Sequence, residues 1–177
     1  MAHPLQSIEP RLLGALTLRL GGLLVFATAL MMFVDVPLQN EASPNGIVSF
    51  ELAGTPQRAL RILLAWKSRH ALGYANLSLI VDFVYLAIYG LFFASLAAWI
   101  GTRIEDAVWS ARAAWGAFMA AAFDVLENAV LLFQVNRFSS PSPFPQLAAT
   151  FAGLKFALLI LSALYGAVAG IVLWRRR

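Results

Sequence analysis

The stretch FVYLAIYGLFFASLAAWI, from Phe83 to Ile100, contains no charged side chain. An α-helix rises about 1.5 Å per residue, so roughly 20 apolar residues cross the ~30 Å hydrocarbon core of a bilayer. Together with the mostly apolar residues before it, the stretch forms a segment at about 71–100 that is long enough to span a membrane. The sequence therefore predicts a transmembrane helix here.

Three further segments have the same character, and they lie at about 12–34, 113–134 and 147–174. Across the chain 60% of residues are hydrophobic and 12% are charged, whereas soluble domains average about 45–50% and about 25%. A surface with so few charges is suited to lipid. We therefore predict an all-α, polytopic membrane protein, with residues 1–177 forming one transmembrane domain built as a four-transmembrane-helix bundle.

The long connection between the first two spans, residues 35–70, contains a second helical pattern. Thr55 followed by Pro56 is typical of a helix N-terminus. Up to about residue 70 an apolar face, Ala59, Ile62, Leu63 and Trp66, lies opposite the basic residues Arg58, Arg61 and Arg69. The segment at 56–70 is too short to span a bilayer. We expect an amphipathic helix between helices 1 and 2, which either lies in the membrane interface or packs on the protein itself.

The remaining connections are shorter, with a turn expected at 101–112 and a loop at 135–146. Tryptophans are common at membrane interfaces, so we expect four of them to be interface anchors: Trp66, Trp99, Trp115 and Trp174. We see no cleavable signal peptide, and we expect the first apolar segment to remain as an anchor.

Four spans place both termini on one side of the membrane. That side would hold more basic residues (Arg11, Arg19, Arg103, Arg112 and Arg175–Arg177) than the other side (Arg58, Arg61, Lys67, Arg69 and Arg137). The bias favours cytoplasmic termini. Because the basic residues lie at the ends of apolar segments, the net charge of +4 indicates membrane topology and no nucleic-acid partner. The absence of cysteine excludes thiolate-bound metals, and the chain has no histidine pair for haem.

Ionisable residues within the spans are the main candidates for function. A charge near the bilayer centre costs about 2.5–3.5 kcal/mol on insertion scales, so such residues are expected to face other helices. Asp124, Glu127, Asn128 and Leu131 share one helical face. Asp82 and Lys155 fall at a similar depth in their own spans, and Asp35 lies at the end of the first. The pattern predicts a polar cluster in the outer half of the bundle.

Two interpretations of each candidate remain open. Asp82, Asp124 and Glu127 form either a structural polar network or a ligand site, and they are the ligands if Mg²⁺, Ca²⁺ or Mn²⁺ is bound. Lys155 is a counter-ion or a ligand group, and Asn128 is an interhelical hydrogen-bond donor or a ligand. Tyr85 lines a pocket or is a buried aromatic residue. Glu51 is a lid residue or a solvated loop acid, and His70 is a solvated rim residue or a general base.

Three classes of function are compatible with such a cluster. The first is binding of a cation, proton or small amphiphilic ligand, for transport or sensing. The second is a membrane-embedded enzyme that uses the carboxylates on a lipid-like substrate. The third is an accessory or assembly subunit whose polar core is purely structural. Besides the bilayer, expected partners are a second copy, contacting at Gly166 and Gly170, or another membrane subunit.

The run from Ile47 to Thr55, IVSFELAGT, with Trp66, Asp82-Phe83 and Phe123–Asn128, FDVLEN, resembles sequences of small bacterial membrane proteins. The resemblance covers roughly residues 15–172. It implies a location in the bacterial inner membrane and carries no activity.

Overall fold

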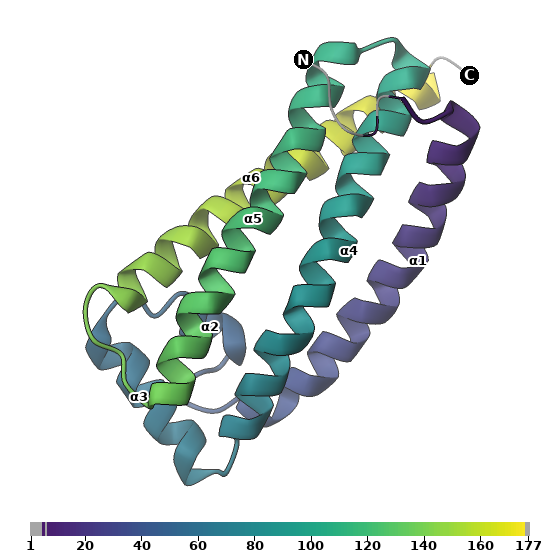
Figure 1. Ribbon diagram of the computed structural model, residues 1–177. Coiled ribbons are helices and arrows are strands. Elements are labelled where there is room, and N and C mark those ends of the chain that lie inside the picture. Colours follow the sequence, from purple (N-terminus) through teal and green to yellow (C-terminus); the bar gives the residue numbers. More distant parts are fainter. Residues whose placement is uncertain (1–4, 6, 176–177) are drawn as a thin grey trace. The chain divides into compact units, whose positions relative to one another are not determined.

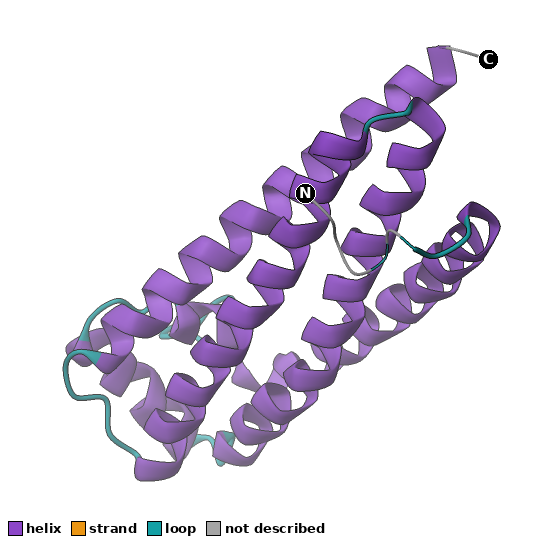
Figure 2. Ribbon diagram, turned by 45° about the horizontal axis from the view of Figure 1, so that its top comes forward, coloured by secondary structure: helices purple, strands orange, loops and turns teal. Residues whose placement is uncertain are grey.

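The computed structural model describes residue 5 and residues 7–175, and these residues form only helices and their connections (Figures 1 and 2). The elements are α1 (Pro10–Asp35), the 3₁₀-helix η1 (Val36–Leu38), α2 (Ile47–Glu51), α3 (Pro56–Ser68), α4 (Leu72–Ile104), α5 (Ala107–Arg137) and α6 (Phe144–Arg175). Helices account for 84% of the structure. The predicted all-α class is confirmed.

Four helices, α1, α4, α5 and α6, are long and apolar enough to cross a membrane. Their bounds extend the predicted spans by a few residues at most ends. In the most apolar windows of α4 and α5, 39% and 33% of residues are buried, against 11% in α1 and in α6. The four helices indicate a multi-pass membrane protein in which α4 and α5 contribute most to the interior.

The turn expected at 101–112 is much shorter than predicted, because α4 continues to Ile104 and α5 starts at Ala107. Glu105 adopts a left-handed conformation, with φ +59°, and the Asp106 amide donates to Gly101 O at 3.0 Å. This is the Schellman arrangement that ends a helix. Asp106 Oδ1 then accepts from Trp109 N at 3.0 Å, which caps α5. Most of the polar residues that we assigned to the turn therefore belong to helix ends.

The same closure ends α3 and α5. His70 has φ +54° and Phe138 has φ +48°. Ala71 N donates to Trp66 O at 2.8 Å, and Ser139 N donates to Gln134 O at 3.1 Å. Each helix thus ends in a left-handed residue that is not glycine, and the chain reverses within a few residues.

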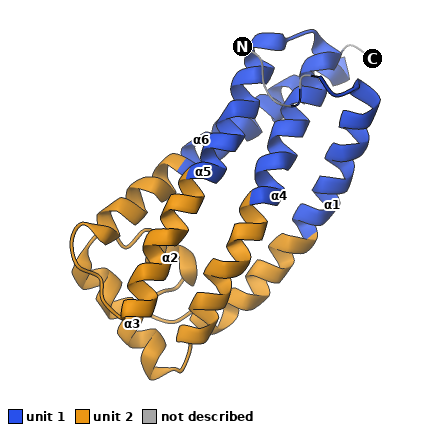
Figure 3. Cartoon of the chain, in the orientation of Figure 1, with its two compact units in different colours: residues 1–25, 87–122, 155–177 blue, residues 26–86, 123–154 orange. Residues whose placement is uncertain are grey.

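The contacts within the chain define two compact units (Figure 3). Unit 1 comprises residues 1–25, 87–122 and 155–177, and unit 2 comprises residues 26–86 and 123–154. Every long helix contributes to both units.

Unit 1 is built on small residues. Its core combines Leu13 with alanines of α4 and α5: Ala94, Ala97, Ala98, Ala113, Ala114 and Ala117. Small side chains allow helices to approach closely. A Cβ atom at Gly101 would collide with the Ser110 side chain. Ser110 Oγ donates to Ala97 O at 3.0 Å, so α4 and α5 also share a hydrogen bond.

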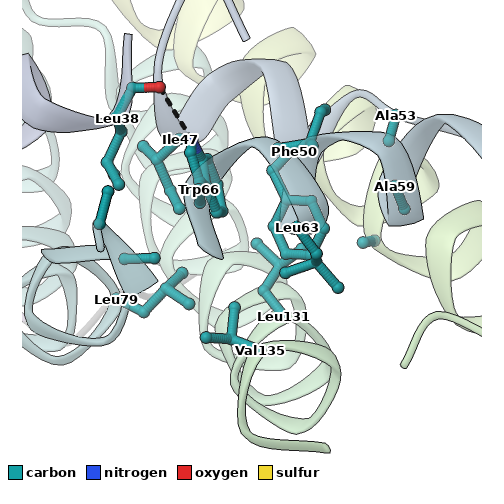
Figure 4. Close-up of a cluster of buried hydrophobic side chains, with 14 residues drawn as sticks. Leu38, Ile47, Phe50, Ala53, Ala59, Leu63, Trp66, Leu79, Leu131 and Val135 are labelled. Atoms are coloured by element: carbon teal, nitrogen blue, oxygen red, sulfur yellow. Dashed lines mark hydrogen bonds between the residues drawn. The ribbon is translucent and has the colours of Figure 1, made fainter. Parts of the chain in front are cut away.

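Unit 2 is built around α3, whose buried residues are Ala59, Ile62, Leu63 and Trp66. This is the predicted apolar face, and Thr55 Oγ1 accepts from Arg58 N at 3.3 Å as the predicted N-cap. The face packs on the protein itself, in a cluster with residues of α2, α4 and α5 (Figure 4). The basic residues Arg58, Arg61 and Lys67 are exposed.

Trp66 is not the interface anchor that we expected, because it is fully buried in this cluster. Its Nε1 donates to Leu38 O at 2.8 Å and to Ser43 Oγ at 3.0 Å. Phe50 of α2 packs edge-on against it, with ring centroids 5.2 Å apart. Trp66 therefore joins α3 to the connection after α1 (Figure 4).

Candidate functional site

All predicted site residues except Lys155 belong to unit 2. Their side chains differ in burial. Four are buried: Glu51, Asp124, Glu127 and Asn128. Asp35, Asp82 and Tyr85 are half-buried, and His70 is exposed.

Asn128 and Asp82 join α5 to α4. Asn128 Nδ2 donates to Asp82 Oδ2 at 2.6 Å, which confirms Asn128 as an interhelical hydrogen-bond donor. Asp82 is half-buried, whereas Asn128 has no exposed surface. The pair fixes the register of two neighbouring helices.

The carboxyl groups of α5 lie on its buried face, as the sequence predicted. Asp124 is 1% exposed, and Glu127 and Leu131 are 0% exposed. The spacing of three and four residues puts them on one stripe with Asn128, so the whole stripe faces the protein. Both carboxyls make interactions within the chain.

Glu51 is not the solvated loop acid that was one of its two interpretations. It is the last residue of α2, a short helix that we did not predict, and it is 6% exposed. α2 packs beside α3 through Ile47 and Phe50, which brings the Glu51 backbone into the core of unit 2. A third buried carboxyl thus belongs to this unit.

Asp35 stabilises α2. Its Oδ1 accepts from Ile47 N at 2.7 Å, so a carboxylate lies at the N-terminus of that helix, where the backbone amides attract negative charge. Gly46 is required beside it, because a Cβ atom there would overlap the carboxylate. Asp35 thus acts on α2 as well as ending α1.

Tyr85 and His70 have local roles. The hydroxyls of Tyr85 and Thr28 share a hydrogen bond at 3.2 Å, so Tyr85 joins α4 to α1 within unit 2. The His70 side chain is exposed, and its backbone ends α3. Neither residue contributes a buried charge.

Lys155 belongs to unit 1 and is 5% exposed. Its Nζ lies 4.8 Å from the centroid of the Phe156 ring, at a distance typical of a cation–π contact. It also makes a further interaction.

Sequence reasoning missed Gln134, which we took as the end of the third span. It is 0% exposed, and it lies seven residues after Glu127 on the same stripe. That seven-residue spacing could have identified Gln134 as a buried residue from the sequence. Gln134 Oε1, Asn128 Oδ1 and Ser78 Oγ are buried without a hydrogen-bond partner among the described residues.

The described residues contain no group of three or more histidine, aspartate or glutamate side chains placed to hold a metal ion. We therefore do not assign Asp82, Asp124 and Glu127 as a metal centre. No protein-family model, curated protein or solved structure matches the chain. What the site does must be argued from its residues.

Proposed function

We propose that the chain is an integral membrane protein that binds protons, or a small cation, for transport or sensing. The binding groups would be the carboxyl cluster of unit 2, by which we mean Glu51, Asp82, Asp124 and Glu127. The observation that supports this most strongly is an imbalance of buried charge. Among the described residues the buried ionisable side chains are Glu51, Asp124 and Glu127 on one side and Lys155 on the other. All four side chains make interactions within the chain, and the buried carboxyls outnumber the buried ammonium group by three to one.

A surplus of buried carboxyls in a membrane is stabilised by bound protons or by a cation that replaces the lost hydration. A proton, unlike a larger ligand, needs no cavity. The two described cavities, one beside α3 and one at the α4–α5 turn, are lined by other residues.

The proposal includes a membrane orientation. Basic residues are more numerous on the side of the termini, which favours termini in the cytoplasm. The sequence resemblance implies that the membrane is the bacterial inner membrane. α3 would then lie on the opposite side, with its exposed Arg61 and Lys67 at the level of the lipid head groups. A homodimer with contacts at Gly166 and Gly170 is also proposed. Among the described residues outside its own helical turns, no atom lies within 4 Å of a Cβ atom built at Gly170, whereas Leu96 Cδ2 lies 3.5 Å from one built at Gly166.

Infrared difference spectroscopy on protein in lipid nanodiscs tests the function, because it separates carboxylic acids from carboxylates. We expect the wild type to show a carboxylic-acid band near neutral pH, or a carboxylate band that shifts when sodium or magnesium is added. Asp124→Asn and Glu127→Gln should each remove part of this signal. Glu41→Gln is the matched control, because Glu41 is exposed in the same unit.

Circular dichroism confirms that each variant is folded. If the wild-type spectrum contains only carboxylates that respond neither to pH nor to added cations, the cluster binds no proton or cation and the proposal is wrong.

A further inference from the structure

The polar stripe of α5 continues beyond the carboxyl groups towards the C-terminal end of that helix. Asn128 and Gln134 both lie on the buried side of this helix without exposed surface. Gln134 Nε2 donates to Val130 O at 3.4 Å, but Gln134 Oε1 and Asn128 Oδ1 have no partner in the described part of the chain. Each is a strong acceptor that faces the interior of unit 2.

α4 adds a polar atom between these two levels. The Asp82–Asn128 hydrogen bond fixes α4 and α5 antiparallel, and Leu79 with Leu131 continues the same register in the buried cluster. Because α4 and α5 run in opposite directions, this register places Ser78 between the levels of Asn128 and Gln134. Ser78 Oγ is also buried without a partner among the described side chains.

The stripe ends beside a cavity. Ser139 N donates to Gln134 O at 3.1 Å, so the next residue, Ser140, follows directly on the end of α5. Ser140 is 6% exposed and its Oγ has no partner within the described residues. Ser140 lines an open cavity of about 470 Å³, together with Pro56 and Leu60 of α3 and Phe138.

Four buried polar atoms without a partner, at successive heights from Asn128 to Ser140, require an explanation. Buried polar atoms in proteins nearly always have a partner, either protein or ordered water, and a buried water makes about three hydrogen bonds to such groups. At about 1.5 Å per residue, Asn128 and Gln134 lie ~9 Å apart along α5, further than one ~2.8 Å hydrogen bond spans. Several water molecules in series would serve all four atoms.

We propose that Ser140, Gln134, Ser78 and Asn128 line an internal water chain that connects the cavity beside α3 with the carboxyl cluster, and that protons reach the carboxyls along it. A hydronium ion at the cavity releases its proton to the chain, the excess proton passes between hydrogen-bonded waters, and an O–H bond forms on a carboxylate. The role in proton delivery rests on the proposed function, whereas the presence of water does not.

The charged and titratable side chains of unit 2 lie on α1 to α5 and their connections. The carboxyls on the helices are Asp35 of α1, Glu51 of α2, Asp82 of α4, and Asp124 and Glu127 of α5. Glu41, the basic residues of α3, Arg69, His70 and Arg137 are exposed. The water chain therefore begins near basic side chains and ends at acidic ones. The exposed bases do not compete for the proton inside the protein.

Hydroxyl-radical labelling tests for water directly, because radiolysis of internal water oxidises adjacent side chains. We expect Leu131, which has no exposed surface, to be oxidised in the wild type. Gln134→Leu, which has similar volume and no acceptor, should reduce that labelling at least about tenfold. Gln146→Leu is the matched control, since Gln146 is exposed on α6. An unlabelled Leu131 in the wild type overturns the proposal.

Proton uptake after a pH jump tests delivery. We expect Gln134→Leu to slow uptake about tenfold without changing the number of protons bound, and Ser140→Ala to slow it as well. Unchanged rates in both folded variants overturn the delivery route. If the wild type binds no protons at all, the proposed function fails, and the labelling of Leu131 still decides whether the water chain exists.

Discussion

The hydrogen bond between Asn128 and Asp82 should contribute a measurable coupling energy to folding. Its 2.6 Å length is that of a charge-assisted bond, for which net contributions are about 1.5–3 kcal/mol. Measured interhelical bonds in membrane proteins average about 0.6 kcal/mol and reach about 1.7. Because Asn128 is buried and Asp82 is half-buried, we expect a value near the top of that range, about 1.5 kcal/mol.

A double-mutant cycle separates this coupling energy from the cost of the cavities that the alanine substitutions create. The free energies of unfolding of Asp82→Ala, Asn128→Ala and the double variant would be measured by reversible denaturation in mixed micelles. The control cycle pairs Asp82→Ala with Asn136→Ala, because Asn136 is exposed and bonds only within its own helix, to Leu132 O at 2.9 Å. A coupling below about 0.5 kcal/mol, equal to that of the control cycle, would refute the reasoning.

Two further predictions concern the structure that holds α2 and α3 in place. Trp66→Phe removes an indole N–H that donates to two oxygens, and it leaves a small cavity. We therefore expect a loss of about 2–3 kcal/mol in the free energy of unfolding and faster tryptic cleavage at Arg61. Trp174→Phe, at an exposed site, should change neither, and equal stability of the two variants would contradict the prediction. Gly46→Ala puts a methyl group into the Asp35 carboxylate at a residue with φ +54°. We therefore expect a thermal melt to show a loss of about 2 kcal/mol or more in the free energy of unfolding. The control Gly153→Ala, where the space is open, should show no such loss. Wild-type stability in Gly46→Ala would show that Asp35 does not cap α2.

The long helices and α3 could be predicted because their signals are local. Continuous apolar length defines the spans, and helical spacing places Ala59, Ile62, Leu63 and Trp66 on one face. Both signals depend only on neighbouring residues. The buried stripe of Asp124, Glu127 and Asn128 was predictable for the same reason.

The contacts between segments were not predictable in this way. α2 is only five residues long, and it is stabilised by Asp35 from another part of the chain, which no local pattern reveals. The Asp82–Asn128 bond depends on the register of α4 against α5. The turn at Glu105 and Asp106 was mistaken for a longer loop, because a left-handed residue other than glycine leaves no clear sequence signal.

That two-residue turn has a consequence for biogenesis. A connection of Glu105 and Asp106 alone is too short for α4 and α5 to cross a bilayer independently, so the two spans would insert together as a helical hairpin. Asp82 and Asn128 lie almost equally far from the turn along their helices. The Asp82–Asn128 hydrogen bond would thus form as the hairpin closes. Asp82 would then enter the membrane already hydrogen-bonded.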